Sequence, residues 1–168
     1  MEGTKIVYNV GDRIVYPMHG AGIIESIESR EVLGKTQEYY IMRLSSSGDM
    51  TVMIPKQKCD EIGVRFVISK EEAAKVLETF RKIPVYEDSN WNKRHRDNMV
   101  KIKSGDIYQV LSVVKDLMYR DKSKGLSTSE RKMLNSAKQI MVSELVLSKV
   151  AGQADIENII CDTVDELF

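Results

Sequence analysis

The residues of this sequence that are best suited to chemistry would bind an anionic partner. The run Asn90-Trp91-Asn92-Lys93-Arg94-His95-Arg96 places the single tryptophan of the chain beside three permanent cations. An indole ring can stack on a base or enter a groove of a duplex, while lysine and arginine neutralise the flanking phosphates. The alternative is a core position, because at about 100° per residue a helix would carry Trp91, His95, Met99 and Ile102 on one arc. The residue types alone favour the core position, because tryptophan is usually largely buried.

A second basic cluster surrounds a predicted loop and the start of the helix that follows it. Its members are Arg120, Lys122, Lys124, Arg131 and Lys132. A loop that leads into a helix N-terminus is a ready phosphate site, because the free backbone N–H groups and the helix dipole both favour an anion. A solvated tip of a helical hairpin explains the same cluster equally well.

Apolar residues in the first part of the chain could bind another protein. Arg30, Val32 and Leu33 lie on one predicted strand or turn, and Met50, Val52 and Met53 lie on another. Exposed methionine and branched side chains at the edge of a sheet can accept a strand from a partner. Core packing is the simpler explanation, and the residue types alone favour it.

The sequence contains no recognisable catalytic or metal-binding motif. Gly20-Ala21-Gly22 lacks the third glycine of the dinucleotide fingerprint. His19 and His95, with Cys59 and Cys161, are too widely spaced for a set of metal ligands. We therefore expect a protein that is not an enzyme and holds no cofactor or metal. Two distant cysteines are also typical of a reducing cytoplasm.

Charge is segregated along the chain, although the formal net charge is zero. Residues 81–138 carry 14 Lys and Arg against 7 Asp and Glu, whereas residues 139–168 carry 1 against 6. The basic middle favours an anionic partner, although solvated helix faces would give the same asymmetry. No apolar stretch is long enough to span a bilayer, and the first residues are too polar for a secretory signal. We expect a cytoplasmic protein without a membrane contact.

The spacing of apolar residues changes near residue 68 from the period of strands to that of helices. Short strands are predicted over residues 12–16, 20–28, 38–44 and 50–54, with turns at 34–35 and 45–49. Such a pattern is typical of a small closed or partly open barrel. Capping boxes at Ser69 with Glu72 and at Ser127 with Glu130 predict two helix starts. Further helices are predicted over about 91–103, from 106, and near residues 156–167.

The sequence therefore predicts an α+β protein with two modules. Residues 1–68 form a β-barrel module, and residues 69–168 form a compact all-α module of about five helices.

Several motifs, in this order, resemble the CarD/CdnL family of bacterial transcription regulators. The first module carries the signature Val15-Tyr16-Pro17-Met18-His19-Gly20-Ala21-Gly22, and the transcription-repair coupling factor shares this module. The helical half adds Asn90-Trp91, Ser104-Gly105-Asp106, Val113-Val114-Lys115-Asp116-Leu117, Gly125-Leu126-Ser127 and Glu130-Arg131-Lys132-Met133-Leu134. Because the coupling factor shares only the first module, the helical half favours CarD/CdnL.

The resemblance implies a Tudor-like, SH3-like barrel that binds the β subunit of RNA polymerase. It also implies a helical module that contacts promoter DNA at the upstream edge of the bubble and stabilises the open complex. Trp91 would be a minor-groove wedge, and the DNA contacts would come from Lys93, Arg94, Arg96, Arg131 and Lys132. The polymerase contacts would come from Arg30, Val32 and Met53. Some relatives carry an arginine at the position of Met53, so an apolar contact would replace an ion pair there.

Two other functions remain as alternatives at this point. One is a nucleic-acid-binding protein that never contacts polymerase, and the other is a protein–protein adaptor whose basic face serves only solubility. We expect a monomer, with a strand-swapped dimer as the alternative, because exposed barrel edges invite strand exchange.

Overall fold

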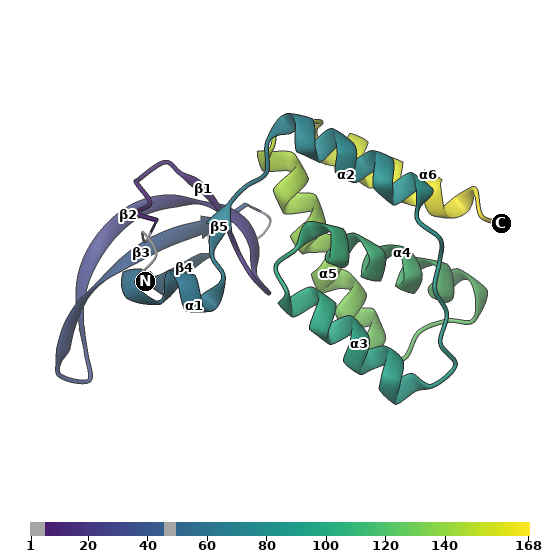
Figure 1. The fold of residues 1–168 in the computed structure, drawn as a ribbon, viewed down its shortest axis with the longest axis horizontal. Helices are drawn as coiled ribbons and strands as arrows, with labels where there is room; N and C mark the ends of the chain where they lie inside the picture. The colour runs from purple at the N-terminus through teal and green to yellow at the C-terminus, as the bar shows by residue number, and fades with distance from the viewer. Residues whose placement is uncertain (1–5, 46–49) are drawn as a thin grey trace, which may run out of the picture.

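The computed structural model describes residues 6–45 and 50–168, and it consists of a curved sheet beside a group of helices (Figure 1). Five strands form one antiparallel sheet in the order β4-β3-β2-β1-β5. The strands are β1 (Arg13–Tyr16), β2 (Gly20–Val32), β3 (Lys35–Leu44), β4 (Thr51–Pro55) and β5 (Arg65–Phe66). A 3-10 turn (Lys56–Lys58) and α1 (Cys59–Ile62) connect β4 to β5. Most of the turn predicted at 45–49 lies outside the described residues.

Strands β2 and β3 form a long hairpin that extends beyond the rest of the sheet (Figure 1). Its turn consists of Leu33 and Gly34, which both have positive φ, at 53° and 77°. Two such residues are the requirement of a type I′ hairpin turn. The prediction ended β2 four residues early, because residues 29–32 are all exposed and show no apolar alternation.

The inner face of the sheet holds its own apolar core. The largest buried side chains there are those of Tyr8, Ile14, Ile24, Tyr40, Met42 and Ile54. Tyr8 donates its hydroxyl hydrogen to the carbonyl of Val64 at 3.0 Å, and Tyr40 accepts from the backbone N–H of Tyr8 at 3.1 Å. Strands β4 and β5 remain the two edges, so the sheet corresponds to the partly open form of the predicted barrel.

Five helices follow the sheet, as the sequence predicted. They are α2 (Lys70–Lys82), α3 (Trp91–Lys103), α4 (Ile107–Ser123), α5 (Thr128–Leu147) and α6 (Gln153–Asp165). Both predicted helix starts are confirmed, because Ser69 Oγ accepts from Glu72 N–H at 3.1 Å and Ser127 Oγ accepts from Glu130 N–H at 3.2 Å. The glutamate side chains do not complete the capping boxes, since Glu72 accepts from Tyr108 and Glu130 from Arg94. Within the described residues, none of the helices has the length and apolar content that crossing a membrane requires.

The helices surround a second core, to which α4 and α5 contribute the most residues. Lys115 of α4 is buried in this half, and its ammonium group donates to the carbonyls of Phe80 and Ile83 at 2.7 and 2.8 Å. Burial lowers the pKa of Lys115. Because cations favour the C-terminal end of a helix, this residue fixes the end of α2 and the start of the loop that leads to α3.

Candidate nucleic-acid interface

Trp91 is the first residue of α3 and lies at the protein surface. Asn90 Oδ1 accepts from Lys93 N–H at 3.2 Å, and this cap fixes the start of the helix. The indole is 41% exposed and stacks on the His95 ring, with centroids 4.9 Å apart and planes 17° apart. The core position that the residue types favoured for Trp91 is therefore wrong.

The indole also connects α3 with the start of α5. Trp91 Nε1 donates to Ser127 Oγ at 3.3 Å, and Ser127 is the N-cap of α5. Two helix N-termini, each with its partial positive charge, therefore contact the same aromatic side chain. The stack and the hydrogen bond together hold the indole in one orientation at the surface.

Arg94 was expected to face DNA, but its side chain is buried inside the protein. Its side chain is 8% exposed, and its Nε and Nη2 atoms donate to the two carboxylate oxygens of Glu130 at 2.8 and 3.1 Å. Its Nη1 donates to the carbonyl of Asp88 at 2.7 Å. Burial alone would raise the pKa of Glu130, but the hydrogen bonds and charge of Arg94 outweigh burial and hold that pKa below its usual value.

Arg94 is buried because its side of α3 packs against α5. The buried residues of α3 are Arg94, Asn98 and Ile102, so the buried side shares only Ile102 with the predicted arc, whereas His95 and Met99 are half-buried and Trp91 is exposed. Arg94 therefore joins α3 to α5 internally, and it is not available to a phosphate. We exclude it from the candidate interface.

The other predicted cations are exposed, but two of them have acidic partners. Lys93 pairs with Asp88 at 3.2 Å, and Arg131 pairs with Asp121 at 2.9 Å. Such exposed pairs contribute little to stability and can exchange for a phosphate. Arg96 and Lys132 are also exposed, and in the part of the chain that the structure describes neither forms an ion pair.

The second basic cluster is largely paired as well. Lys122 pairs with Asp165 of α6, and Lys124 lies 3.9 Å from Glu87. The acidic end of the chain thus neutralises part of the basic middle. The candidate interface therefore consists of Trp91, the paired Lys93 and Arg131, and the unpaired Arg96 and Lys132.

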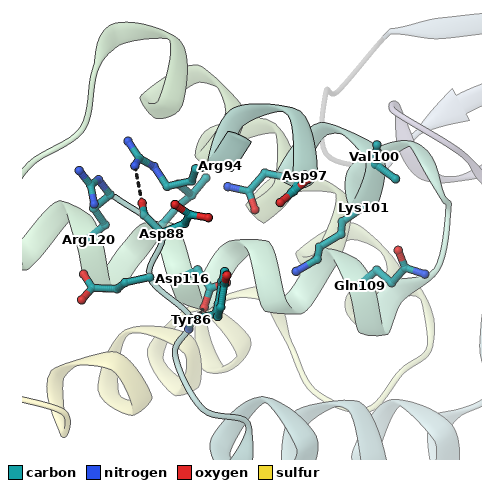
Figure 2. Close-up of a pocket in the computed structure, with 12 residues that line it drawn as sticks. Tyr86, Asp88, Arg94, Asp97, Val100, Lys101, Gln109, Asp116 and Arg120 are labelled. Carbon is teal, nitrogen blue, oxygen red and sulfur yellow. Dashed lines mark hydrogen bonds between the residues drawn. The ribbon is translucent and has the colours of Figure 1, made fainter. Parts of the chain in front are cut away.

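A cavity of about 350 Å³ lies behind this surface, between the α2–α3 loop, α3 and α4 (Figure 2). The carboxylate of Asp116 accepts from the backbone N–H of Tyr86 at 2.9 Å and so holds the loop against α4. Burial raises the pKa of Asp116 to about 6. Lys101, Arg120 and Asp97 also line the cavity. The lining carries both charges, and the hydrogen bonds of Asp116 and Arg94 in it hold the loop before Asn90 against α4 and α3. Among the described residues, no group of three or more His, Cys, Asp or Glu side chains could hold a metal ion.

The residues expected to contact polymerase lie on the outer face of the sheet. Arg30 pairs in register with Gln37 of β3, and Met53 of β4 pairs with Ile41 of β3. Paired residues of antiparallel strands lie on the same face, as do residues an even number apart on one strand. Arg30 and Met53 therefore share a face, and because their partners are four positions apart on β3, they are separated by about 13 Å along the strand.

These three side chains are accessible on that face. Val32 is 43% exposed and Met53 is 42% exposed, so the core packing that the residue types favoured is wrong for both. Arg30 is also exposed, and its guanidinium forms an ion pair with Glu28 at 2.6 Å. A partner that binds Arg30 would have to replace this exposed pair, which costs little.

Two family models match successive parts of the chain. Residues 8–68 match the family model described as the CarD-like/TRCF RID domain, and residues 75–161 match the model described as CarD, C-terminal domain. Over 152 residues the chain is 40% identical to the Bacillus subtilis (strain 168) protein named "Putative transcription factor YdeB", covering 90% of this chain and 99% of that protein. The chain belongs to the CarD family.

A solved structure of a CarD-family module is also similar to part of this chain. The solution NMR structure of the 72-residue N-terminal domain of Myxococcus xanthus CarD is 38% identical and covers 34% of this chain and 76% of that one, with a TM-score of 0.30.

The structure adds residues to the candidate site of this CarD-family protein that the sequence did not suggest. Ser127 and Glu130 were predicted only as a capping box, but they also bind Trp91 and Arg94. His95 was a candidate core residue, and it supports the indole. The capping motif and the family resemblance marked Ser127 and Glu130, but neither indicated the contacts to α3, because those contacts span 36 residues of sequence.

Proposed function

We propose that this CarD-family protein is a transcription regulator that binds the β subunit of RNA polymerase and promoter DNA at the same time. The outer face of the sheet would bind polymerase through Arg30, Val32 and Met53. Trp91 would bind the upstream edge of the melted promoter, and the open complex would last longer. These partners place the protein in the cytoplasm.

The observation that carries the proposal is the position of Trp91. The ring is 41% exposed, and its orientation is already fixed by His95 and Ser127. A side chain that is ordered before binding loses less entropy when it binds. Minor-groove proteins use such apolar wedges between base steps.

The charges around Trp91 support contacts with the DNA backbone. Arg96 and Lys132 have no acidic partner among the described residues and are free to neutralise phosphates. Lys93 and Arg131 could exchange their exposed ion pairs for phosphates. Contacts of this kind position a protein on a duplex but carry no sequence information, so we expect little sequence preference.

The membership of both halves in the CarD family supports the combination of the two contacts in one chain. The similar Bacillus subtilis protein is named as a transcription factor, and the model matched by residues 8–68 is shared with the TRCF RID domain. At the position of Met53 an apolar contact would take the place of an ion pair.

Trp91→Ala tests the proposal directly. Stacking on a base is worth about 1–3 kcal/mol, and 1.4 kcal/mol changes an equilibrium about tenfold. We therefore expect the lifetime of the open complex to fall about tenfold, while the melting temperature and the retention of the polymerase β subunit stay near those of the wild type. Phe168→Ala is the control, because it removes an exposed aromatic ring that stacks on Tyr119 of α4 and is not part of the candidate interface.

An unchanged lifetime with Trp91→Ala would rule out the wedge. Failure of the wild-type protein to retain the β subunit would favour a nucleic-acid-binding protein that acts alone. Retention of the β subunit without any effect of the protein on the open complex would favour an adaptor.

A further inference from the structure

Two of the sequence motifs belong to neither proposed binding surface. They are the signature Val15–Gly22 at the start of the sheet and Ser104-Gly105-Asp106 in the turn between α3 and α4. The structure brings them into contact. Pro17 is buried, and a Cβ atom added to Gly105 would lie 3.1 Å from Pro17 Cγ. Gly105 also has a φ of 73°, which favours glycine there on conformational grounds as well.

Arg65 of β5 connects the sheet to the helices at the same place. Its Nε and Nη2 atoms donate to the carbonyl of Gly105 at 3.0 and 2.8 Å, and its Nη1 and Nη2 atoms donate to the two carboxylate oxygens of Glu144 at 2.6 and 2.7 Å. Glu144 of α5 is 1% exposed and also accepts from the backbone N–H of Ile68 at 3.0 Å. One side chain therefore joins β5, the α3–α4 turn and α5.

A second set of contacts lies beside Arg65. The N–H of Ala21 donates to Ser143 Oγ at 2.9 Å, and a Cβ atom added to Gly20 would lie 2.8 Å from that oxygen. Arg13 Nη1 donates to the carbonyl of Leu147 at 2.8 Å. Between these bonds, Val15 and Ala21 are buried against Leu147. These contacts form a joint between the sheet and the helices, which combines an apolar cluster with hydrogen bonds that have definite directions.

We propose that this joint is rigid and that Arg65 is a positioning residue that sets where Trp91 lies relative to the polymerase-binding sheet. The inference rests on the proposed function, because it concerns the distance between the two proposed surfaces. Arg65 holds the C-terminal end of α3, and Trp91 begins that helix. Docking of the sheet on polymerase would then hold Trp91 at a fixed position relative to the promoter DNA.

The geometry of α3 shows why a small loosening would matter. The helix has 13 residues, and at 1.5 Å per residue it spans about 20 Å. A rotation of 10° about the joint would therefore move Trp91 by about 3 Å. Such a displacement is close to the roughly 3.4 Å that separates successive bases along a strand.

The distance between the two surfaces can be measured in the free protein. Nitroxide labels would be attached through Leu33→Cys, at the fully exposed hairpin turn, and Asn92→Cys, beside Trp91, in a chain that carries Cys161→Ser. Cys59 is buried and can stay. We expect one narrow distribution of distances in this protein.

Arg65→Gln combined with Glu144→Gln removes the ion pair without leaving a buried carboxylate unpaired. We expect a broader distribution of distances and an open-complex lifetime roughly threefold to tenfold shorter, which is the size of effect that residues between two coupled sites have. Retention of the β subunit and affinity for free duplex should stay unchanged. The matched control is Arg81→Gln with Glu78→Gln, which removes an exposed ion pair on α2.

A distribution as narrow as that of the wild type would overturn the proposal, and so would an unchanged lifetime in a background where Trp91→Ala shortens it. If Trp91→Ala also has no effect, the proposed function fails, and the joint loses its positioning role with it. Should the double variant not fold, Pro17→Ala removes the ring that contacts Gly105. An unchanged distance distribution or an unchanged open-complex lifetime in that variant would overturn the proposal in the same way.

Discussion

The contrast between Arg94 and Arg96 provides a sharp test of the site, because the two residues are two positions apart and have different environments. Arg94→Ala leaves the carboxylate of Glu130 buried without its cation. Breaking a buried pair in this way costs about 3–5 kcal/mol of the free energy of unfolding. Arg96 is exposed, and a substitution there should change the free energy of unfolding by less than about 0.5 kcal/mol.

These energies predict different melting temperatures. For a chain of 150–250 residues, 1 kcal/mol shifts the melting temperature by about 2–4 °C. Arg94→Ala should therefore lower it by roughly 6–20 °C, and Arg96→Ala should leave it within about 2 °C. Thermal denaturation followed by circular dichroism at pH 7 measures both.

A double-mutant cycle completes the test. Arg94→Met with Glu130→Leu replaces the pair by apolar side chains of similar size and should recover much of the loss. If Arg94→Ala instead melts like the wild type and weakens duplex binding as much as Arg96→Ala does, Arg94 is a DNA contact and our reasoning about its burial is wrong.

Three further predictions concern charge. Arg96→Ala should reduce the slope of log affinity for duplex DNA against log salt by about 0.9, whereas Lys122→Ala should change it less because Lys122 is paired; equal effects would contradict this. Because burial raises the pKa of Asp116 to about 6, its contribution to stability is present below about pH 4 and is lost as the pH rises through 6. Asp116→Asn should thus stabilise the protein at pH 7.5 by roughly 1–2 kcal/mol, allowing for solvent screening, and not at pH 4; a lower melting temperature at pH 7.5 would refute it. Arg30→Glu should weaken retention of the β subunit in a pull-down, and unchanged retention would remove Arg30 from that surface.

Local signals were sufficient for most helix boundaries. The capping serines Ser69 and Ser127 each precede their helix by one residue, and Asp106 accepts from Tyr108 N–H to start α4. Such caps depend on residues only two or three positions away, so they can be recognised in a sequence. Strand β5 could not be, because it has two residues and exists only through its pairing with β1.

The site was less predictable because its decisive contacts are distant in sequence. A helical wheel placed Trp91, His95, Met99 and Ile102 on one arc, but it could not show that Arg94, one turn from Trp91, is the side chain that is buried against α5. That depends on Glu130, which is 36 residues away and fixes Arg94 inside. The joint between the sheet and the helices was even less predictable, because Arg65 and Glu144 are 79 residues apart. Conversely, the type and position of Trp91 at the helix start were visible in the sequence.

The distribution of charge indicates what each of the two proposed contacts would contribute to affinity and to the preference for the open promoter. Phosphates are present in closed and open promoters alike, so Arg96 and Lys132 would bind both forms and could not by themselves shift the equilibrium between them. A ligand shifts an equilibrium only by its difference in affinity for the two states. Unstacked bases at the edge of the bubble exist only in the open promoter, and Trp91 is the aromatic group of the candidate surface that could bind them. Few unpaired cations would make binding to free DNA weak, but docking on polymerase would raise the effective concentration of the helical half to about the millimolar range. We therefore expect the polymerase contact to supply most of the affinity and Trp91 to supply the preference for the open form.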